Sequence, residues 1–207
     1  MLDVGCGDGA MVPNLEEAGV GRYVGLDLSH RMVQRARRVW TKDCSGMTRE
    51  FHRASFLDIN KGSDFVAEGF DAVLFNGSLQ FFDNFEVVLA RARALLRHHE
   101  IIDGGDSGDG VSTSNSGGVV GEHGRIVVAH VNGGSFVRTE HEGSPLIAVS
   151  IMPDLAEVQA ALDRIGNSDS DVEQNTRLRV LTEHEYAEHE YGRSPVDLEE
   201  FYLCVCA

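Results

Sequence analysis

The sequence predicts one α/β domain, built on a mostly parallel sheet with helices on both faces. Apolar segments with strand character alternate with helical segments along most of the 207 residues. The segments between most predicted strands are long enough to hold a crossover helix, as parallel strands require. A glycine-rich turn at residues 5–9 follows the first apolar segment. Glycines in this position are typical of a strand that turns sharply into a helix.

Seven segments have the composition of strands. RYVGLDL at 22–28 and FDAVLFN at 70–76 are apolar runs of the length expected for buried parallel strands. The last two segments are short, and we expect them to pair as a hairpin. The predicted strands are 2–4, 22–28, 51–57, 70–76, 125–130, 178–181 and 201–206.

Four helices are expected between these strands. The segment 85–98 is rich in Ala, Leu and Arg at amphipathic spacing, and 31–40 carries basic residues on its outer side. Ser29 is a suitable N-cap for the latter, and Gly19 and Gly21 are stop signals for the first helix. The predicted helices are 11–18, 31–40, 85–98 and 153–165.

A polar segment interrupts the alternation at residues 103–121. It consists almost entirely of Gly, Ser, Asp, Asn and Thr. This composition cannot bury enough apolar surface to offset the entropy cost of ordering, so we expect a flexible insertion. Because the strand pattern resumes at 125–130, we expect residues 1–207 to form a single domain.

The net charge of −15 restricts the partners that the surface can attract. An acidic surface repels nucleic-acid phosphates and anionic membranes, so we expect neither as a partner. A small-molecule substrate is the better match. Nothing in the sequence indicates the oligomeric state.

Cysteine use and the lack of targeting signals predict an intracellular, cytoplasmic protein. The four cysteines form no CxxC pair, which suits reduced thiols. No apolar run reaches the roughly 20 residues of a membrane span, and no signal peptide is visible. Because the chain opens directly on a strand, we expect a preceding helix and any targeting segment to be missing from this sequence.

The glycine-rich turn has the chemistry of a ligand-binding loop. Gly5, Gly7 and Gly9 allow a sharp turn whose backbone lies against a ligand without a Cβ in the way. The exposed N–H groups and the helix N-terminus favour ligand oxygens, including a carboxylate. Asp3, near the end of the strand, could accept from a cationic amino group or brace the loop.

Polar residues follow the next three predicted strands. Asp27 lies 18 residues after Gly9, where a carboxylate can accept from both ribose hydroxyls, and Leu28 beside it belongs to the same site. Asp58 follows the third strand and could accept from an adenine amine. Asn76 and Gly77 follow the fourth strand and could meet the amino-acid end of a cofactor.

Two ligand classes fit the glycine turn. Gly5, Gly7 and Ala10 match the GxGxxG/A fingerprint of NAD-binding proteins, with Asp27 as its ribose acid. Asp3 would be an unusual charge near a pyrophosphate, whereas it suits an ammonium group. Together with Gly9 and Asp58, Asp3 favours a nucleoside joined to an amino acid.

Three motifs resemble those of the class I S-adenosylmethionine (SAM)-dependent methyltransferases: LDVGCGDG, VGLDLS and FDAVLFNGSLQFF. The resemblance covers about residues 1–135, and HVNGGSF, MPDLAEVQAAL and LEEFYLCV are similar to small methyltransferase-type-11-like proteins. It implies a Rossmann-like three-layer sandwich with strand order 3-2-1-4-5-7-6, an antiparallel last strand and SAM as the cofactor. It also implies cofactor-binding roles for Gly5, Gly7, Gly9, Asp27 and Asp58.

The expected function is methyl transfer to an unidentified small-molecule acceptor. His130, at the end of the fifth strand, is the candidate general base, although a strand-end histidine can also bond local backbone. An NAD-dependent oxidoreductase and a non-catalytic methyltransferase-like binding protein are the alternatives.

Two further patterns are ambiguous. HEYAEH at 184–189 predicts no metal site, because its histidines are five residues apart instead of the four of HExxH. Phe81, Phe82 and Phe85 could line a substrate pocket, but aromatic residues that enter a helix more often belong to the core.

Overall fold

The computed structural model of the chain describes seven stretches of residues. They are 1–40, 46–66, 69–97, 124–130, 133–167, 178–180 and 202–206. The predicted insertion at 103–121 and the histidine pair at 184–189 lie outside these stretches.

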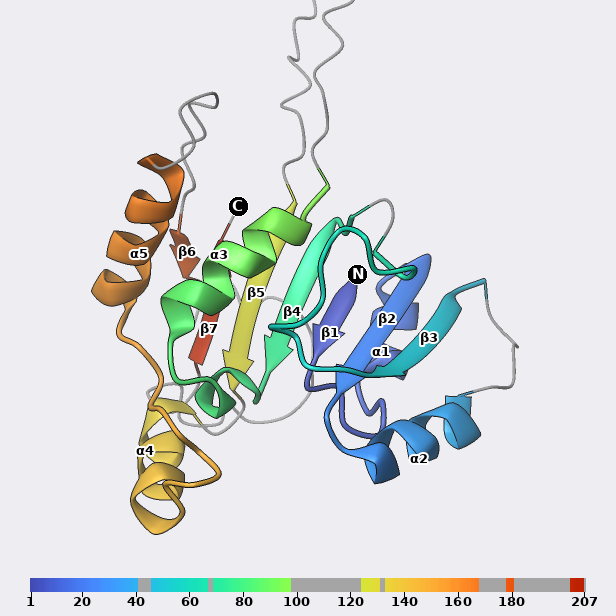
Figure 1. Ribbon diagram of the computed structural model, residues 1–207, viewed down its shortest axis with the longest axis horizontal. Coiled ribbons are helices and arrows are strands. Elements are labelled where there is room, and N and C mark those ends of the chain that lie inside the picture. Colours follow the sequence, from blue (N-terminus) through green and yellow to red (C-terminus); the bar gives the residue numbers. More distant parts are fainter. Residues whose placement is uncertain are drawn as a thin grey trace, which may run out of the picture.

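A seven-stranded sheet forms the middle layer, with the order β3-β2-β1-β4-β5-β7-β6 (Figure 1). Strands β1 to β5 are parallel, and β7 is antiparallel to both of its neighbours. The predicted fold class and strand order are therefore confirmed. The strands are β1 (Leu2–Val4), β2 (Arg22–Asp27), β3 (Thr48–Arg53), β4 (Ala72–Asn76), β5 (Arg125–His130), β6 (Leu178–Val180) and β7 (Tyr202–Cys206).

Helices cover both faces of the sheet. On one face, α1 (Val12–Glu17) and α2 (His30–Trp40) bury residues such as Val12 and Val33 against Tyr23. On the other face, α3 (Phe85–Leu95) and α5 (Leu155–Asn167) close a larger core, and both lie in front of the sheet in Figure 1. Among the described residues, no helix is long and apolar enough to cross a membrane.

The predicted third strand was misplaced. β3 runs from Thr48 to Arg53, not over 51–57, because it pairs along the whole length of β2, from Arg22↔Thr48 to Asp27↔Arg53. The chain turns away after Arg53, and Phe56 enters the core instead of continuing the strand. Asp58 consequently lies five residues beyond the strand end.

One helix was not predicted. α4 (Gly133–Gly143) has glycines at both ends and a mostly polar sequence, so its helical signal is weak. Val137 is buried in the larger core and fixes the helix there. In Figure 1, α4 lies beyond the sheet edge to which the arrowheads of β4 and β5 point. A short 3-10 helix, η1 (Leu79–Phe81), follows β4 at the same edge.

A substitution at Phe75 tests how much the larger core contributes to stability. Phe75 is fully buried, and its ring packs edge-on against the rings of Phe56 and Phe82, with centroid distances of 5.3 and 6.3 Å. We expect Phe75→Ala to lower the free energy of unfolding by about 3–5 kcal/mol, measured by urea denaturation, because it leaves a cavity. Val87→Ala, at a half-exposed position of α3, is the control and should cost well under half as much.

Candidate functional site

The glycine turn after β1 adopts a backbone that only glycine tolerates easily. Gly5, Gly7 and Gly9 have φ values of +74°, +57° and +81°. A Cβ on Gly5 would lie 2.6 Å from the Cβ of Ser78, whereas a Cβ on Gly7 would meet nothing within 4 Å. The turn is therefore packed against the chain at Gly5 and borders open space at Gly7.

Asp27 fixes this turn to the end of β2. Its Oδ2 accepts a hydrogen bond from Gly7 N at 2.9 Å, and its Oδ1 accepts from Ser29 N at 2.7 Å. Leu26 O adds two backbone bonds, from Gly5 N at 2.8 Å and Cys6 N at 2.9 Å. A carboxylate offers about four acceptor positions, so Asp27 retains room for ligand hydroxyls.

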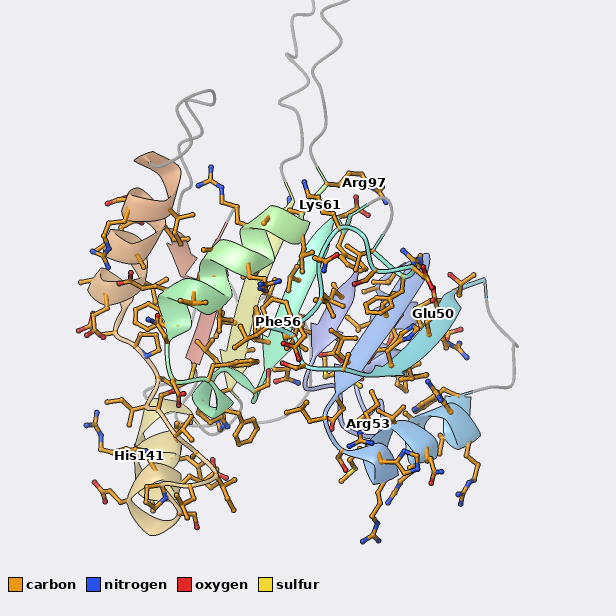
Figure 2. The ribbon with its side chains drawn as sticks, viewed as in Figure 1. Glu50, Arg53, Phe56, Lys61, Arg97 and His141 are labelled. Atoms are coloured by element: carbon orange, nitrogen blue, oxygen red, sulfur yellow. The ribbon has the colours of Figure 1, made fainter. Side chains whose placement is uncertain are left out.

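A pocket of about 210 Å³ opens beside Asp27. Most of its lining is apolar, and Leu28, 69% exposed, stands at the rim. Figure 2 shows Phe56 in front of the sheet and Arg53 close to α2, while Arg97 lies at the opposite edge. The lining residues are Val4, Gly5, Leu26, Asp27, Leu28, Ala54, Ser55, Phe56, Ser78, Phe81 and Phe82.

Three of the predicted cofactor residues, Gly5, Asp27 and Leu28, line this pocket, and Gly7 is bonded to Asp27. Sequence reasoning missed Ser55 and Ser78. Ser78 is fixed by a 2.5 Å bond from its hydroxyl to Val4 O, across 74 residues of sequence. No local sequence pattern predicts a contact between residues so far apart in the chain.

Asp3 does not lie in the pocket. It is 2% exposed, on the face of β1 opposite to Leu2 and Val4, and accepts a 2.7 Å hydrogen bond from the Tyr23 hydroxyl. Burial raises the pKa of Asp3 to about 6, a rise that the Tyr23 bond opposes and the nearby Asp27 charge reinforces. The structure therefore gives Asp3 an internal partner, so its carboxylate no longer helps to choose between ligand classes.

The remaining predicted residues are not among those that line the pocket. Asp58 is exposed and is not part of the lining, because β3 ends earlier than expected. Asn76 ends β4 and is half-buried. Gly77, with φ +64°, donates its N–H to Ala129 O at 2.8 Å and thereby joins the ends of β4 and β5.

His130 is buried at the end of β5 and is not among the residues that line the pocket. Its Nε2 lies 3.4 Å from the amide Nε2 of Gln80, and its ring centroid lies 5.7 Å from that of Phe136. Burial lowers the pKa of His130, and the Glu140 carboxylate opposes this effect. The imidazole is therefore held neutral near pH 7, the form that a general base requires.

Comparison with known families gives one match. Residues 1–99 match the sequence model of a family described as "Methyltransferase domain". No curated protein sequence matches the chain.

Solved structures with the same fold are numerous but distant. An S-adenosylmethionine-dependent methyltransferase from Mesorhizobium loti superposes with a TM-score of 0.58 at 15% identity, covering 99% of this chain and 88% of its own. The YcgJ protein from Bacillus subtilis superposes with a TM-score of 0.57 at 14% identity, and the match covers 86% of this chain and 62% of YcgJ. Magnesium protoporphyrin IX methyltransferase from Synechocystis with bound SAM superposes with a TM-score of 0.55 at 12% identity. The match covers 99% of this chain and 67% of that protein. The chain thus spans less than two thirds of the Bacillus subtilis protein.

The buried Asp3 predicts a specific pH dependence of stability. Its pKa is higher in the folded protein than its ordinary value of 3.8, so the folded state binds the proton more tightly and loses stability as the pH rises from about 4 to 6. Asp3→Asn removes this loss. The difference in unfolding free energy, Asp3→Asn minus wild type, should therefore increase between pH 4 and pH 7, by up to about 3 kcal/mol.

Urea denaturation at a series of pH values measures this difference. Asp83→Asn, at an exposed carboxylate before α3, is the control and should give a smaller change with pH. A difference for Asp3→Asn that stays constant from pH 4 to 7 would contradict the assignment.

Proposed function

We propose that this chain, which has the fold of the class I SAM-dependent methyltransferases and matches the methyltransferase domain over residues 1–99, transfers a methyl group from SAM to a small-molecule acceptor. The main support for the proposal is the pocket at the carboxyl ends of β1 and β2, where Asp27 is hydrogen-bonded to the glycine turn. Ligands of open α/β sheets bind outside the carboxyl ends of the strands.

The residues around this pocket fit an adenosyl cofactor. Gly7 borders open space, so a ligand can approach the backbone of the turn. The Asp27 carboxylate has acceptor positions left for two ribose hydroxyls. Leu28 and Phe82 supply apolar surface on which a flat base can pack, and Ser55 adds a polar group beside it.

The cofactor would supply an electrophilic methyl group. The protein's contribution is to hold the acceptor in line with that group, because orientation alone can provide much of the rate enhancement of a displacement. His130, buried and neutral, is the residue that we assign to accept a proton from the acceptor.

Binding measurements separate this proposal from the two alternatives. Calorimetry with SAM, S-adenosylhomocysteine and NAD should give binding of the first two and none of NAD. Tight NAD binding without SAM binding would favour the oxidoreductase. Binding of SAM without methyl transfer to any compound in a broad metabolite panel with labelled SAM would favour the non-catalytic protein.

Asp27 is the residue on which cofactor affinity should depend most. We expect Asp27→Asn to weaken S-adenosylhomocysteine binding about 10- to 100-fold in calorimetry, because charge-assisted bonds to the ribose are lost. Asp58→Asn is the comparison, and its exposed position outside the lining predicts a change of less than about twofold. A larger loss for Asp58→Asn than for Asp27→Asn would contradict this site. Circular dichroism checks that the turn still folds.

His130 should affect turnover more than cofactor affinity. Because it lies outside the pocket lining, His130→Ala should leave the S-adenosylhomocysteine Kd within about threefold while lowering kcat about 10²-fold or more. Steady-state kinetics on the acceptor found in the screen measure this. Unchanged turnover would remove His130 from the mechanism.

A further inference from the structure

The end of α2 is bonded to the glycine turn through the only tryptophan of the chain. Trp40 is the last residue of α2, and its indole N–H donates to Asp8 O at 2.9 Å. Asp8 lies in the turn between Gly7 and Gly9, which both have positive φ. The bond joins residues 32 positions apart, so a helix that covers the sheet also fixes the turn.

The indole also packs against the backbone of the turn. A Cβ on Gly9 would lie 2.6 Å from the indole Nε1 and 2.7 Å from its Cδ1. These distances are far too short for two non-bonded heavy atoms, so the ring can approach the turn this closely only because residue 9 is glycine. Gly9 therefore faces Trp40, and its missing side chain makes room for the contact with α2.

A second contact between α2 and the turn is electrostatic. Arg35 Nε lies 3.0 Å from Asp8 Oδ2, and the two side chains are 69% and 34% exposed. An ion pair at such an exposed position contributes little, because water and salt screen it. The Trp40 bond is partly buried, so we expect it to restrain Asp8 more strongly than the ion pair does.

The helix that carries Trp40 is itself fixed to the sheet. Val33 and Ala36 are buried in the smaller core. Arg37 donates from its Nε and from one Nη to Phe51 O in β3, at 2.9 and 2.6 Å. The packing of α2 on the sheet thus determines where the indole N–H meets the turn.

Two hydrogen bonds enclose one peptide group of the turn. Asp27 accepts from Gly7 N on one side, and Trp40 donates to Asp8 O on the other. The peptide between these bonds carries the Asp8 N–H, which donates to no group within the residues that the structure describes. Because Gly7 borders open space, a ligand can reach this peptide. The two bonds together restrict the orientation of the Asp8 N–H.

We propose that Trp40 is a positioning residue for the cofactor and acts by holding the glycine turn in its ligand-binding conformation. This inference rests on the proposed function. Glycines with positive φ allow the turn many conformations. Without the indole bond the turn samples more of them, and a ligand must then spend part of its binding free energy on ordering the turn. Trp40 thereby raises cofactor affinity, although it does not line the pocket.

The first test removes the donor and keeps an aromatic ring. We expect Trp40→Phe to weaken S-adenosylhomocysteine binding to the full chain about fivefold in calorimetry, because one hydrogen bond to the turn is lost. Val33→Ala, at a buried position of the same helix, is the control. It also removes buried volume, but the Val33 side chain cannot form a hydrogen bond, so affinity should stay within about twofold of wild type. Urea denaturation measures the stability that each variant loses.

The second test uses the wild-type chain. Because Trp40 is the only tryptophan, ¹⁵N-tryptophan labelling gives a single indole N–H signal in NMR spectra. Coupling is reciprocal, so a bond that strengthens ligand binding about fivefold is itself strengthened about fivefold by the bound ligand. We expect saturating S-adenosylhomocysteine to shift the indole signal and to slow its hydrogen exchange by about this factor. A tryptophan that only packs in the core would show neither change.

The outcomes distinguish the two proposals. Suppose that S-adenosylhomocysteine binds the wild-type chain. If Trp40→Phe then keeps the wild-type affinity, if Val33→Ala weakens binding as much, or if the indole signal and its exchange do not change at saturation, the positioning role is wrong and the proposed function stands. If Trp40→Phe does not fold, the indole measurement decides. If neither SAM nor S-adenosylhomocysteine binds, the proposed function is wrong, and the positioning role is rejected with it.

Discussion

The Asp27 carboxylate joins the ends of two neighbouring strands, since it accepts hydrogen bonds from Gly7 N in the turn after β1 and from Ser29 N at the start of α2. Leu26 O holds the turn from the same strand. These bonds keep a loop of residues with positive φ in one conformation, although glycine itself allows many. The pocket, the exposure of the turn on its open side and the position of Leu28 at the rim all depend on this connection.

The 3-10 helix η1 separates two environments. Successive residues of such a helix point about 120° apart, so neighbours in sequence face different parts of the molecule. Ser78 and Phe81 face the pocket beside Asp27, while Gln80, between them, faces His130. The pocket and the buried Gln80–His130 contact thus share η1 as a boundary.

Two acidic residues illustrate the limit of reasoning from spacing. Asp3 is next to the glycine turn, but the alternation of side chains along β1 directs it to the face of α1 and α2, where Tyr23 donates to it. Asp58 follows an apolar segment, but that segment leaves the sheet at Arg53, because the register with β2 ends there. The end of β2 was predicted to within one residue, because Val24 and Leu26 mark a buried strand and the N-cap region of α2 follows Asp27 at once.

The sequence by itself determined the α/β class, the succession of strands, and the glycine turn with Asp27 and Leu28 beside it, at the edge where the proposed cofactor pocket lies. These features follow from local patterns: apolar runs, glycines where φ is positive, and a carboxylate at a strand end. Only the tertiary structure decided that Asp3 is paired internally, that Ser78 closes the turn, that a polar, glycine-flanked segment forms α4, and that Gln80 faces His130. Those outcomes depend on contacts between residues up to 74 positions apart, and sequence spacing carries no information about which distant groups become neighbours when the layers pack.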